Sequence, residues 1–354
     1  MKFRYVAALV AAAFGTGPAM TSADTFNLTL ATGHPEVFPH VAFLGKVFVP
    51  EVERLLKEWG SPHSITWLQA YGGTLVKTGS ELQALQQGVI DVAFVPTLFS
   101  ASQLPLEQVT YQAPFISPDD QVIRAAMAKV REGNPAFKEA WDAYGATVLS
   151  PGSICDDYNL MLTEPAASLA ELEGRRIYAP GPTANWLRDT GMVAVAGNMS
   201  EYYQGIQSGI ADGVLVLTSA AFPGKYYEVA PHFVKVSLGA QWCSTIAMNT
   251  AKLDGLPDDV QTAIKTAATT YSVNLMETVN ANLVKHLDMM AENGATITEW
   301  SDEARREWAE AIPNIAQDWA AAIDAKGLPG SDVLKALEAE TKALGATPLR
   351  DWSE

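Results

Sequence analysis

The chain has 354 residues, with 40 acidic and 24 basic side chains and a formal net charge of −16 at pH 7. This length is enough for two lobes with a core each. The acidic balance argues against binding to nucleic acids or anionic membranes, because such binding needs basic stripes.

The amino terminus is predicted to be a secretory signal peptide, residues 1–23. Lys2 and Arg4 precede an apolar run over residues 5–14, and small residues lead up to Ala23. The run is shorter than the roughly 20 residues that a membrane-spanning helix needs, and the whole pattern is typical of a cleaved signal. We therefore expect a soluble mature protein that is exported to the periplasm.

The first 150 residues alternate short apolar strands with amphipathic helices, which is typical of an α/β sheet with parallel strands. Pro50 falls inside the first long helical pattern and is expected to kink it. The expected strands cover residues 26–31, 64–71, 91–96 and 146–150, and the expected helices cover residues 40–59, 80–87, 119–131 and 136–144.

The next hundred residues repeat the alternation. A crossover at residues 151–153 leads into the second set of elements, and two later strands return. The expected strands cover residues 176–180, 192–196, 214–217, 233–236 and 243–248, and the expected helices cover residues 183–190 and 200–208.

One pattern, Q-x-x-Q-x-G-x-x-D, occurs twice, over residues 83–91 and 204–212. Each copy lies where a helix ends and an apolar strand begins. The glycine suits the left-handed residue that closes a helix. The duplication predicts two lobes built to one plan that face each other across a cleft, where small ligands prefer to bind.

A very long helix follows Pro257, with one apolar face over residues 258–293. Thirty-six residues at 1.5 Å per residue make about 54 Å, which is longer than one lobe is wide. A coiled-coil seam is the alternative, but a helix spanning both lobes fits better. The tail over residues 301–343 is expected to form two amphipathic helices broken at residues 327–330.

No catalytic or cofactor-binding pattern stands out. The five histidines are scattered without metal-ligand spacing, and we expect neither a metal nor another cofactor. Cys155 and Cys243 are the two cysteines, and both lie near the expected crossovers between the lobes. In an exported protein they either form a disulfide or remain two buried thiols, and the sequence leaves both possibilities open.

Several local motifs together resemble a known family. They are L-x-G-x-x-I-x-x-P at residues 172–180, Y-x-x-I-Q-x-G-x-x-D-G at residues 203–213, A-P-F at 113–115 and L-P-D-D-V-Q at 256–261. Over residues 26–344 the chain resembles the DctP-type periplasmic solute-binding subunit of a TRAP (tripartite ATP-independent periplasmic) transporter. The resemblance implies an α/β, two-lobed, type II-like periplasmic-binding-protein fold with a long helix spanning both lobes. It also implies a small organic solute as ligand and the small and large membrane subunits of the transporter as partners.

The resemblance and the patterns together divide the chain into five parts. These are the signal peptide at residues 1–23, lobe one at 24–151 with a returning segment at about 233–257, lobe two at 152–232, the lobe-spanning helix at 258–293, and C-terminal helices at 294–354.

The chain departs from the family at its ligand positions. The arginine that pairs with a substrate carboxylate in the family aligns with Tyr178, a second family arginine aligns with Tyr158, and a family asparagine aligns with Val216. A phenol cannot hold a carboxylate as a guanidinium fork does. We therefore expect a neutral, aromatic or amine-bearing ligand. The alternatives are an ordinary organic acid held by another cation, such as Lys77, Arg175 or Arg176, and an exported enzyme on the same scaffold.

The remaining candidate ligand-binding residues lie at strand ends or crossovers that would border the cleft. Tyr71 and Trp242 offer aromatic rings, although core packing is the commoner role for a ring in a strand. The pair Asp156-Asp157 is either a solvated turn or a carboxylate that reaches the ligand, and Asp157 is taken as the candidate. His34, beside a strand end, and Met199 complete the expected site.

Overall fold

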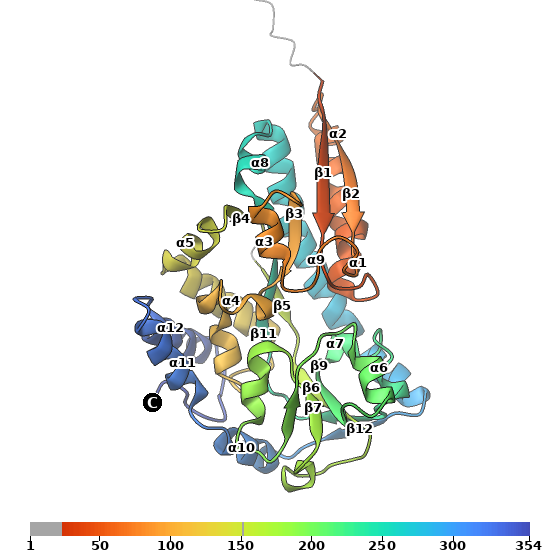
Figure 1. Cartoon of the computed structure of the whole chain (residues 1–354), viewed down its shortest axis with the longest axis vertical. Helices are drawn as coiled ribbons and strands as arrows, with labels where there is room; N and C mark the ends of the chain where they lie inside the picture. The colour runs from red at the N-terminus through yellow and green to blue at the C-terminus, as the bar shows by residue number, and fades with distance from the viewer. Residues whose placement is uncertain (1–22, 151) are drawn as a thin grey trace, which may run out of the picture.

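The computed structural model describes residues 23–150 and 152–354, where the chain forms two lobes, each built on a six-stranded sheet (Figure 1). The predicted signal peptide lies almost wholly outside the described residues. The two-lobed α/β fold with one very long helix, predicted from the sequence, is confirmed.

The sheet of the first lobe has the strand order β2-β1-β3-β11-β4, and β5 pairs with β11 beyond this path. The strands β1, β2 and β3 run parallel, whereas β11 is antiparallel to β3, β4 and β5. The strands are β1 (Thr25–Ala31), β2 (Ser64–Ala70), β3 (Val92–Pro96), β4 (Ala146–Val148), β5 (Ser153–Cys155) and β11 (Gln241–Asn249).

The sheet of the second lobe has the order β12-β10-β6-β9-β7-β8. Its central strands β6 and β9 are antiparallel and buried along their whole length. The strands are β6 (Tyr158–Leu162), β7 (Arg176–Tyr178), β8 (Val193–Val195), β9 (Gly213–Leu217), β10 (His232–Lys235) and β12 (Thr296–Glu299).

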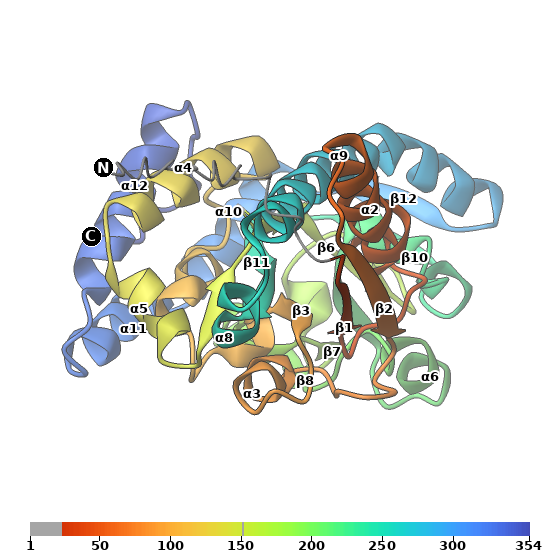
Figure 2. The same ribbon diagram turned by 90° about the horizontal axis from the view of Figure 1, so that it is seen from above.

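Helices cover both sheets, and the last ones pack beside α4 at one side of the molecule (Figure 2). The helices are α1 (Pro39–Phe43), α2 (Val49–Glu58), α3 (Glu81–Gln86), α4 (Asp120–Glu132), α5 (Ala136–Asp142), α6 (Tyr202–Gln207), α7 (Thr218–Ala221), α8 (Thr250–Asp254), α9 (Asp258–Glu292), α10 (Asp302–Ala311), α11 (Ile315–Asp324) and α12 (Gly330–Ala343).

The duplicated glycine–aspartate motif has the same structure in both lobes. Gly88 and Gly209 close α3 and α6 with positive φ angles of 68° and 72°. The Asp91 carboxylate accepts a hydrogen bond from the backbone N–H of Thr29 in β1 at 2.8 Å. The Asp212 carboxylate accepts one from the first residue of β7, also at 2.8 Å. Each aspartate therefore ties its own strand to the neighbouring strand, which the sequence motif did not reveal.

The helix α9 joins the two lobes (Figures 1 and 2). Its first half, from Val260 to Leu275, packs into the core of the first lobe beside α2. Met290, near its end, belongs to the core cluster that includes the second-lobe strands β6, β9 and β10, and α9 also contacts β12 of that lobe. At 1.5 Å per residue its 35 residues span about 52 Å, so the prediction of a lobe-spanning helix is confirmed.

The helical segment expected over residues 40–59 is present and, as expected, is irregular near Pro50. A wide π-helical turn, Leu44–Phe48, lies just before this residue, because proline lacks an N–H and its ring crowds the preceding turn. Two other local expectations differ from the structure. Residues 181–187 form a 3₁₀ turn instead of a helix over 183–190. Pro313 divides the tail, so three helices follow residue 301 rather than two.

The lobe boundaries also differ from the expected ranges. The strand β5, expected in the second lobe, pairs with β11 in the first. The strand β10, expected in the segment returning to the first lobe, pairs with β6 because its apolar Phe233 and Val234 are buried in the second core. The chain therefore crosses between the lobes at residues 156–157 and 236–240 and along α9.

Candidate ligand-binding site

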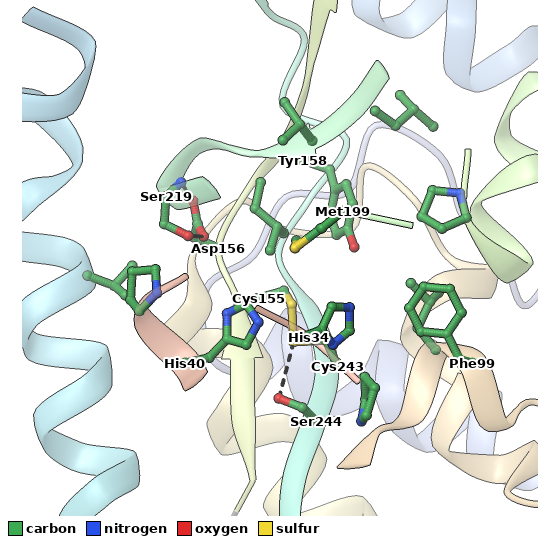
Figure 3. Close-up of a pocket in the computed structure, with 18 of the residues that line it drawn as sticks. His34, His40, Phe99, Cys155, Asp156, Tyr158, Met199, Ser219, Cys243 and Ser244 are labelled. Atoms are coloured by element: carbon green, nitrogen blue, oxygen red, sulfur yellow. Dashed lines mark hydrogen bonds between the residues drawn. A yellow bond between two sulfur atoms is a disulfide. The ribbon is translucent and has the colours of Figure 1, made fainter. Parts of the chain in front are cut away.

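A cavity lies between the two lobes, where the linking segments cross (Figure 3). Its walls come from the β1–α1 segment and β3 of the first lobe, from β6, β9 and α6 of the second, and from α9. Its volume is about 60 Å³, and one water needs about 10–15 Å³ of such space. The cavity thus has room for about four to six water-sized groups, which suits a small solute.

Aromatic rings form much of this wall. Tyr158, the first residue of β6, lies edge-on to Tyr111, with 6.4 Å between the ring centroids. Tyr202 from α6 and Phe94 and Phe99 from the first lobe add further rings. Burial raises the pKa of Tyr158 and of Tyr111, so both phenols stay neutral and act as hydrogen-bonding groups.

Asp156 is the one carboxyl side chain among the described lining residues. The Ser219 backbone N–H donates to its Oδ2 at 2.9 Å, and the Ser219 hydroxyl donates to its Oδ1 at 2.5 Å. Burial nevertheless raises the pKa of Asp156 to about 7, against the opposite effect of these hydrogen bonds. Its charge near neutral pH is therefore easily changed by a bound ligand.

Two histidines face Tyr158 and Met199 across the cavity (Figure 3). The rings of His34 and His40 lie 5.6 Å apart in an edge-to-face arrangement. Burial lowers the pKa of His34 to about 4 and that of His40 to about 3, so both rings are neutral at pH 7. His34 Nδ1 is buried without a hydrogen-bond partner.

No lysine or arginine is among the lining residues that the structure describes. The basic residues that were considered as alternative partners for a ligand carboxylate form other interactions outside the cavity. Arg176 Nη2 pairs with Asp212 at 2.6 Å, Lys77 donates to the carbonyl oxygen of Gly73 at 2.9 Å, and Arg175 donates to backbone carbonyls of the loop before β7.

The structure brings together half of the residues predicted to bind the ligand. The predicted residues that line the cavity are His34, Tyr158, Met199 and Val216. The predicted residues that lie elsewhere are Tyr71, Asp157, Tyr178 and Trp242.

Three of the predicted residues that lie outside the cavity are aromatic. Tyr178 turns toward α6 and packs against Tyr202, 5.0 Å between centroids, so it supports the cavity wall from behind. Trp242 lies in the core under the guanidinium group of Arg131, at 4.8 Å from the ring centroid. The Tyr71 hydroxyl donates to a glutamine of β2 at 2.8 Å.

Asp157 joins the two linkers between the lobes instead of facing the cavity. Its Oδ1 accepts from the Gly239 N–H at 2.9 Å. Two residues later, Asn159 Oδ1 accepts from the N–H groups of Val236 and Ser237, each at 2.9 Å. Burial raises the pKa of Asp157 to about 6.

Cys155 and Cys243 are bonded, with 5.6 Å between their Cα atoms. The disulfide joins β5 to β11 and forms part of the cavity wall. Of the two alternatives left open by the sequence, the structure has the disulfide.

Several lining residues were not predicted from the sequence. Asp156 was considered only together with Asp157, and Asp157 was taken as the candidate. The contact between Asp156 and Ser219 joins residues 63 positions apart, which no local pattern reveals. His40 carried a usable signal, since it follows His34 closely in a loop after a strand. The lining residues not predicted include His40, Phe94, Phe99, Tyr111, Asp156, Tyr202 and Ser219.

Comparison with known families now places the chain. The model of the DctP family, described as bacterial extracellular solute-binding protein, family 7, matches residues 63–322, well over half of the sequence. The chain belongs to this family. It is thus a TRAP-type solute receptor of the extracytoplasmic kind, a class that binds small solutes and works with membrane components.

Individual members of the family show how varied its ligands are. The chain is 27% identical over 277 residues to the C4-dicarboxylate-binding periplasmic protein DctP of Rhodobacter capsulatus, covering 75% of this chain and 78% of that protein. It is 22% identical over 280 residues to the ectoine-binding periplasmic protein TeaA of Halomonas elongata, covering 77% and 80% of the two chains.

Solved structures of TRAP solute-binding proteins share the fold. A Rhodoferax ferrireducens protein in complex with benzoate matches with a TM-score of 0.78 at 17% identity, covering 90% of this chain and 98% of that one. A Bordetella pertussis receptor binding pyroglutamic acid matches with a TM-score of 0.76 at 19% identity, covering 88% and 99%. At these identities the likeness concerns the fold alone.

The described residues contain neither a membrane-spanning helix nor a metal-binding cluster of side chains. In residues 23–150 and 152–354, no helix combines the length and apolar character needed to cross a membrane. The same residues contain no group of three or more histidine, cysteine, aspartate or glutamate side chains placed to hold a metal ion.

Proposed function

We propose that this TRAP solute receptor captures one small organic solute in the interlobe cavity, in the periplasm, and delivers it to the small and large membrane subunits of its transporter without catalysing a reaction. We further propose that the solute carries no unpaired carboxylate. The observation that carries this proposal is the described cavity wall, which contains aromatic rings, two neutral histidines and Asp156 but no lysine or arginine.

Burying an unpaired charge in a cavity is costly. A carboxylate moved from water into a cavity without a cationic partner loses several kcal/mol of solvation free energy. The phenols of Tyr158 and Tyr111 can donate hydrogen bonds but cannot neutralise it. Asp156, when ionised, would repel it. A neutral, aromatic or amine-bearing solute avoids all three costs.

An organic acid is the second candidate. The relative from Rhodobacter capsulatus is named for C4-dicarboxylates, and this similarity favours an acid. Such a ligand would have to protonate His34 or His40, whose pKa values are held at about 4 and about 3 by burial. Its binding should therefore strengthen as the pH falls.

Titration calorimetry against succinate, a keto acid, a polyol, a quaternary amine and an aromatic solute tests the proposal. We expect no micromolar binding of succinate, and we expect ligands that raise the melting temperature to be recovered unchanged. Micromolar succinate binding that persists in the Tyr158→Phe variant would contradict the proposed ligand class. Turnover of a bound compound would favour an exported enzyme instead.

A further inference from the structure

Two buried polar side chains of the cavity, Asp156 and His34, have hydrogen-bonding capacity that no partner uses. Each carboxylate oxygen of Asp156 accepts one hydrogen bond from Ser219, which leaves lone pairs unused on both. His34, only 4% exposed, has an Nδ1 atom without a partner. A buried polar atom without a partner marks a position where a ligand can complete a hydrogen bond.

The aromatic rings in the rest of the cavity wall favour a ligand that carries a positive charge. Tyr158, Tyr202 and Phe94 line the same small cavity as Asp156. The faces of such rings attract cations, most strongly where water is excluded. Figure 3 shows Asp156 and Ser219 on one side of the space and Phe99 on the other, with Tyr158 above and the histidines below.

From this geometry we infer that the ligand is a small organic ammonium ion, whose N–H groups bind the Asp156 carboxylate while its apolar part lies among the aromatic rings. This inference rests on the proposed function and names its ligand class. A quaternary amine has no N–H group to donate to the Asp156 carboxylate. A zwitterion would bring a carboxylate for which the described wall holds no cation.

Asp156 is essential to this argument, because the same burial that keeps His34 and His40 neutral opposes any unpaired cation. The ammonium ion is bound only if its charge is met by an ionised carboxylate. Removing that charge should therefore weaken the binding of amines but not that of their neutral analogues.

The pH dependence follows from the groups that surround Asp156. The phenols of Tyr111, Tyr158 and Tyr202 and the imidazoles of His34 and His40 are all neutral near pH 7. The charge of the neighbouring Asp157 helps to raise the pKa of Asp156. The proton displaced by an ammonium ion is thus that of Asp156, and amine affinity should rise with pH up to about 8.

Two sets of matched compounds test the inference by calorimetry on the full-length mature protein. One set is isobutylamine, isobutanol and isobutyrate, and the other is benzylamine, benzyl alcohol and benzoate. We expect at least one amine to bind more tightly than its alcohol and its acid, with proton release near pH 7. The Asp156→Asn variant should lose about 10- to 100-fold in amine affinity.

Asp120→Asn is the matched control, because Asp120 is a buried carboxyl outside the cavity that hydrogen-bonds Asn280 on α9. Its amine affinity should be unchanged. If the Asp156→Asn variant does not fold, the inference is tested by the proton release that accompanies amine binding to the wild-type protein near pH 7. Failure of both amines to bind, or amine affinity that falls as pH rises, overturns the inference. If an alcohol binds instead, the proposed function stands, whereas tight binding of an acid overturns both.

Discussion

At the scale of single residues, the cavity holds titratable groups with opposite effects on stability. Burial raises the pKa of Asp156, so the folded state binds its proton more tightly than the unfolded state and loses stability as pH rises from about 4 toward 7. Burial lowers the pKa of His34 and His40, so the unfolded state binds their protons more tightly below pH 6.5. The histidines therefore destabilise the fold as pH falls, and the carboxyl does the reverse.

The His40→Gln variant separates these effects. Between pH 6.5 and 4 the wild-type protein should lose stability through His40 by up to about 1.4 kcal/mol per pH unit. The variant should lack this part of the slope, because glutamine does not titrate. Urea unfolding at pH 4.5, 5.5, 6.5 and 7.5 measures it. His63→Gln, outside the cavity, is the control, and an equal change of slope in both variants would contradict the role given to His40.

Residue-scale prediction from sequence reached the right segments but not always the right side chains. Asp156 and Asp157 adjoin at a crossover, and neighbouring side chains of an extended segment point to opposite sides. Asp156 therefore faces the cavity, and Asp157 binds the Gly239 N–H of the second linker. The orientation of the two side chains depends on pairing with a segment about eighty residues away, and the local sequence pattern does not contain this information.

At the scale of elements, local signals predicted most of the fold. The glycines of the repeated motif and Pro50 act through nearby backbone, and the apolar stripe of α9 follows the helical period, so these effects could be predicted locally. The aspartates of the motif instead bind a neighbouring strand that is distant in the sequence. The strand β12 escaped notice because its residues 296–299 are all exposed and lack an apolar alternation. The pairing of β10 with β6 was missed because it joins segments distant in the chain.

The packing of α6 on β7 requires a glycine. A Cβ atom at Gly205 would lie 1.9 Å from the Tyr178 hydroxyl oxygen and 2.7 Å from its Cζ. Gly205→Ala should therefore destabilise the protein by about 1–3 kcal/mol in urea unfolding. Tyr178→Phe should restore part of this loss, because it removes the closest atom. Gly133→Ala, with its nearest atom at 3.3 Å, is the control, and an equal loss there would refute the steric account.

The disulfide ties β5 to β11 across a sequence separation of 88 residues. In the chain-entropy model, closing such a loop stabilises a protein by about 4–5 kcal/mol. The Cys155→Ser/Cys243→Ser variant should lose stability of this order and should also bind ligand less well, since the bond borders the cavity. Unreduced protein should take up no alkylating reagent by intact-mass analysis. Two alkylated cysteines would show that the thiols are free.

At the scale of the whole molecule, three connections hold the lobes together. The linker at residues 236–240 contains two residues with positive φ angles, 48° at Ser237 and 113° at Gly239. Asp157 and Asn159 bind this linker side by side. The helix α9 contributes Leu275 and Val279 to the cavity wall. Rotation about the linkers would thus change the separation of the cavity walls that come from the two lobes.

Ligand binding should therefore close the lobes. Because the cavity is walled by both lobes and by α9, a ligand gains its full set of contacts only in a closed state and shifts the population toward it. Small-angle scattering with the amine that binds more tightly, at a concentration just sufficient to saturate the wild-type protein, should show a smaller radius of gyration than scattering from the free protein. The Asp156→Asn variant at the same amine concentration should give a larger radius than the wild-type complex, because it lacks the charge that binds the amine. A radius that stays unchanged on calorimetrically verified binding would mean that the hinge does not move, and the linkers would then serve only to fix the two lobes in place.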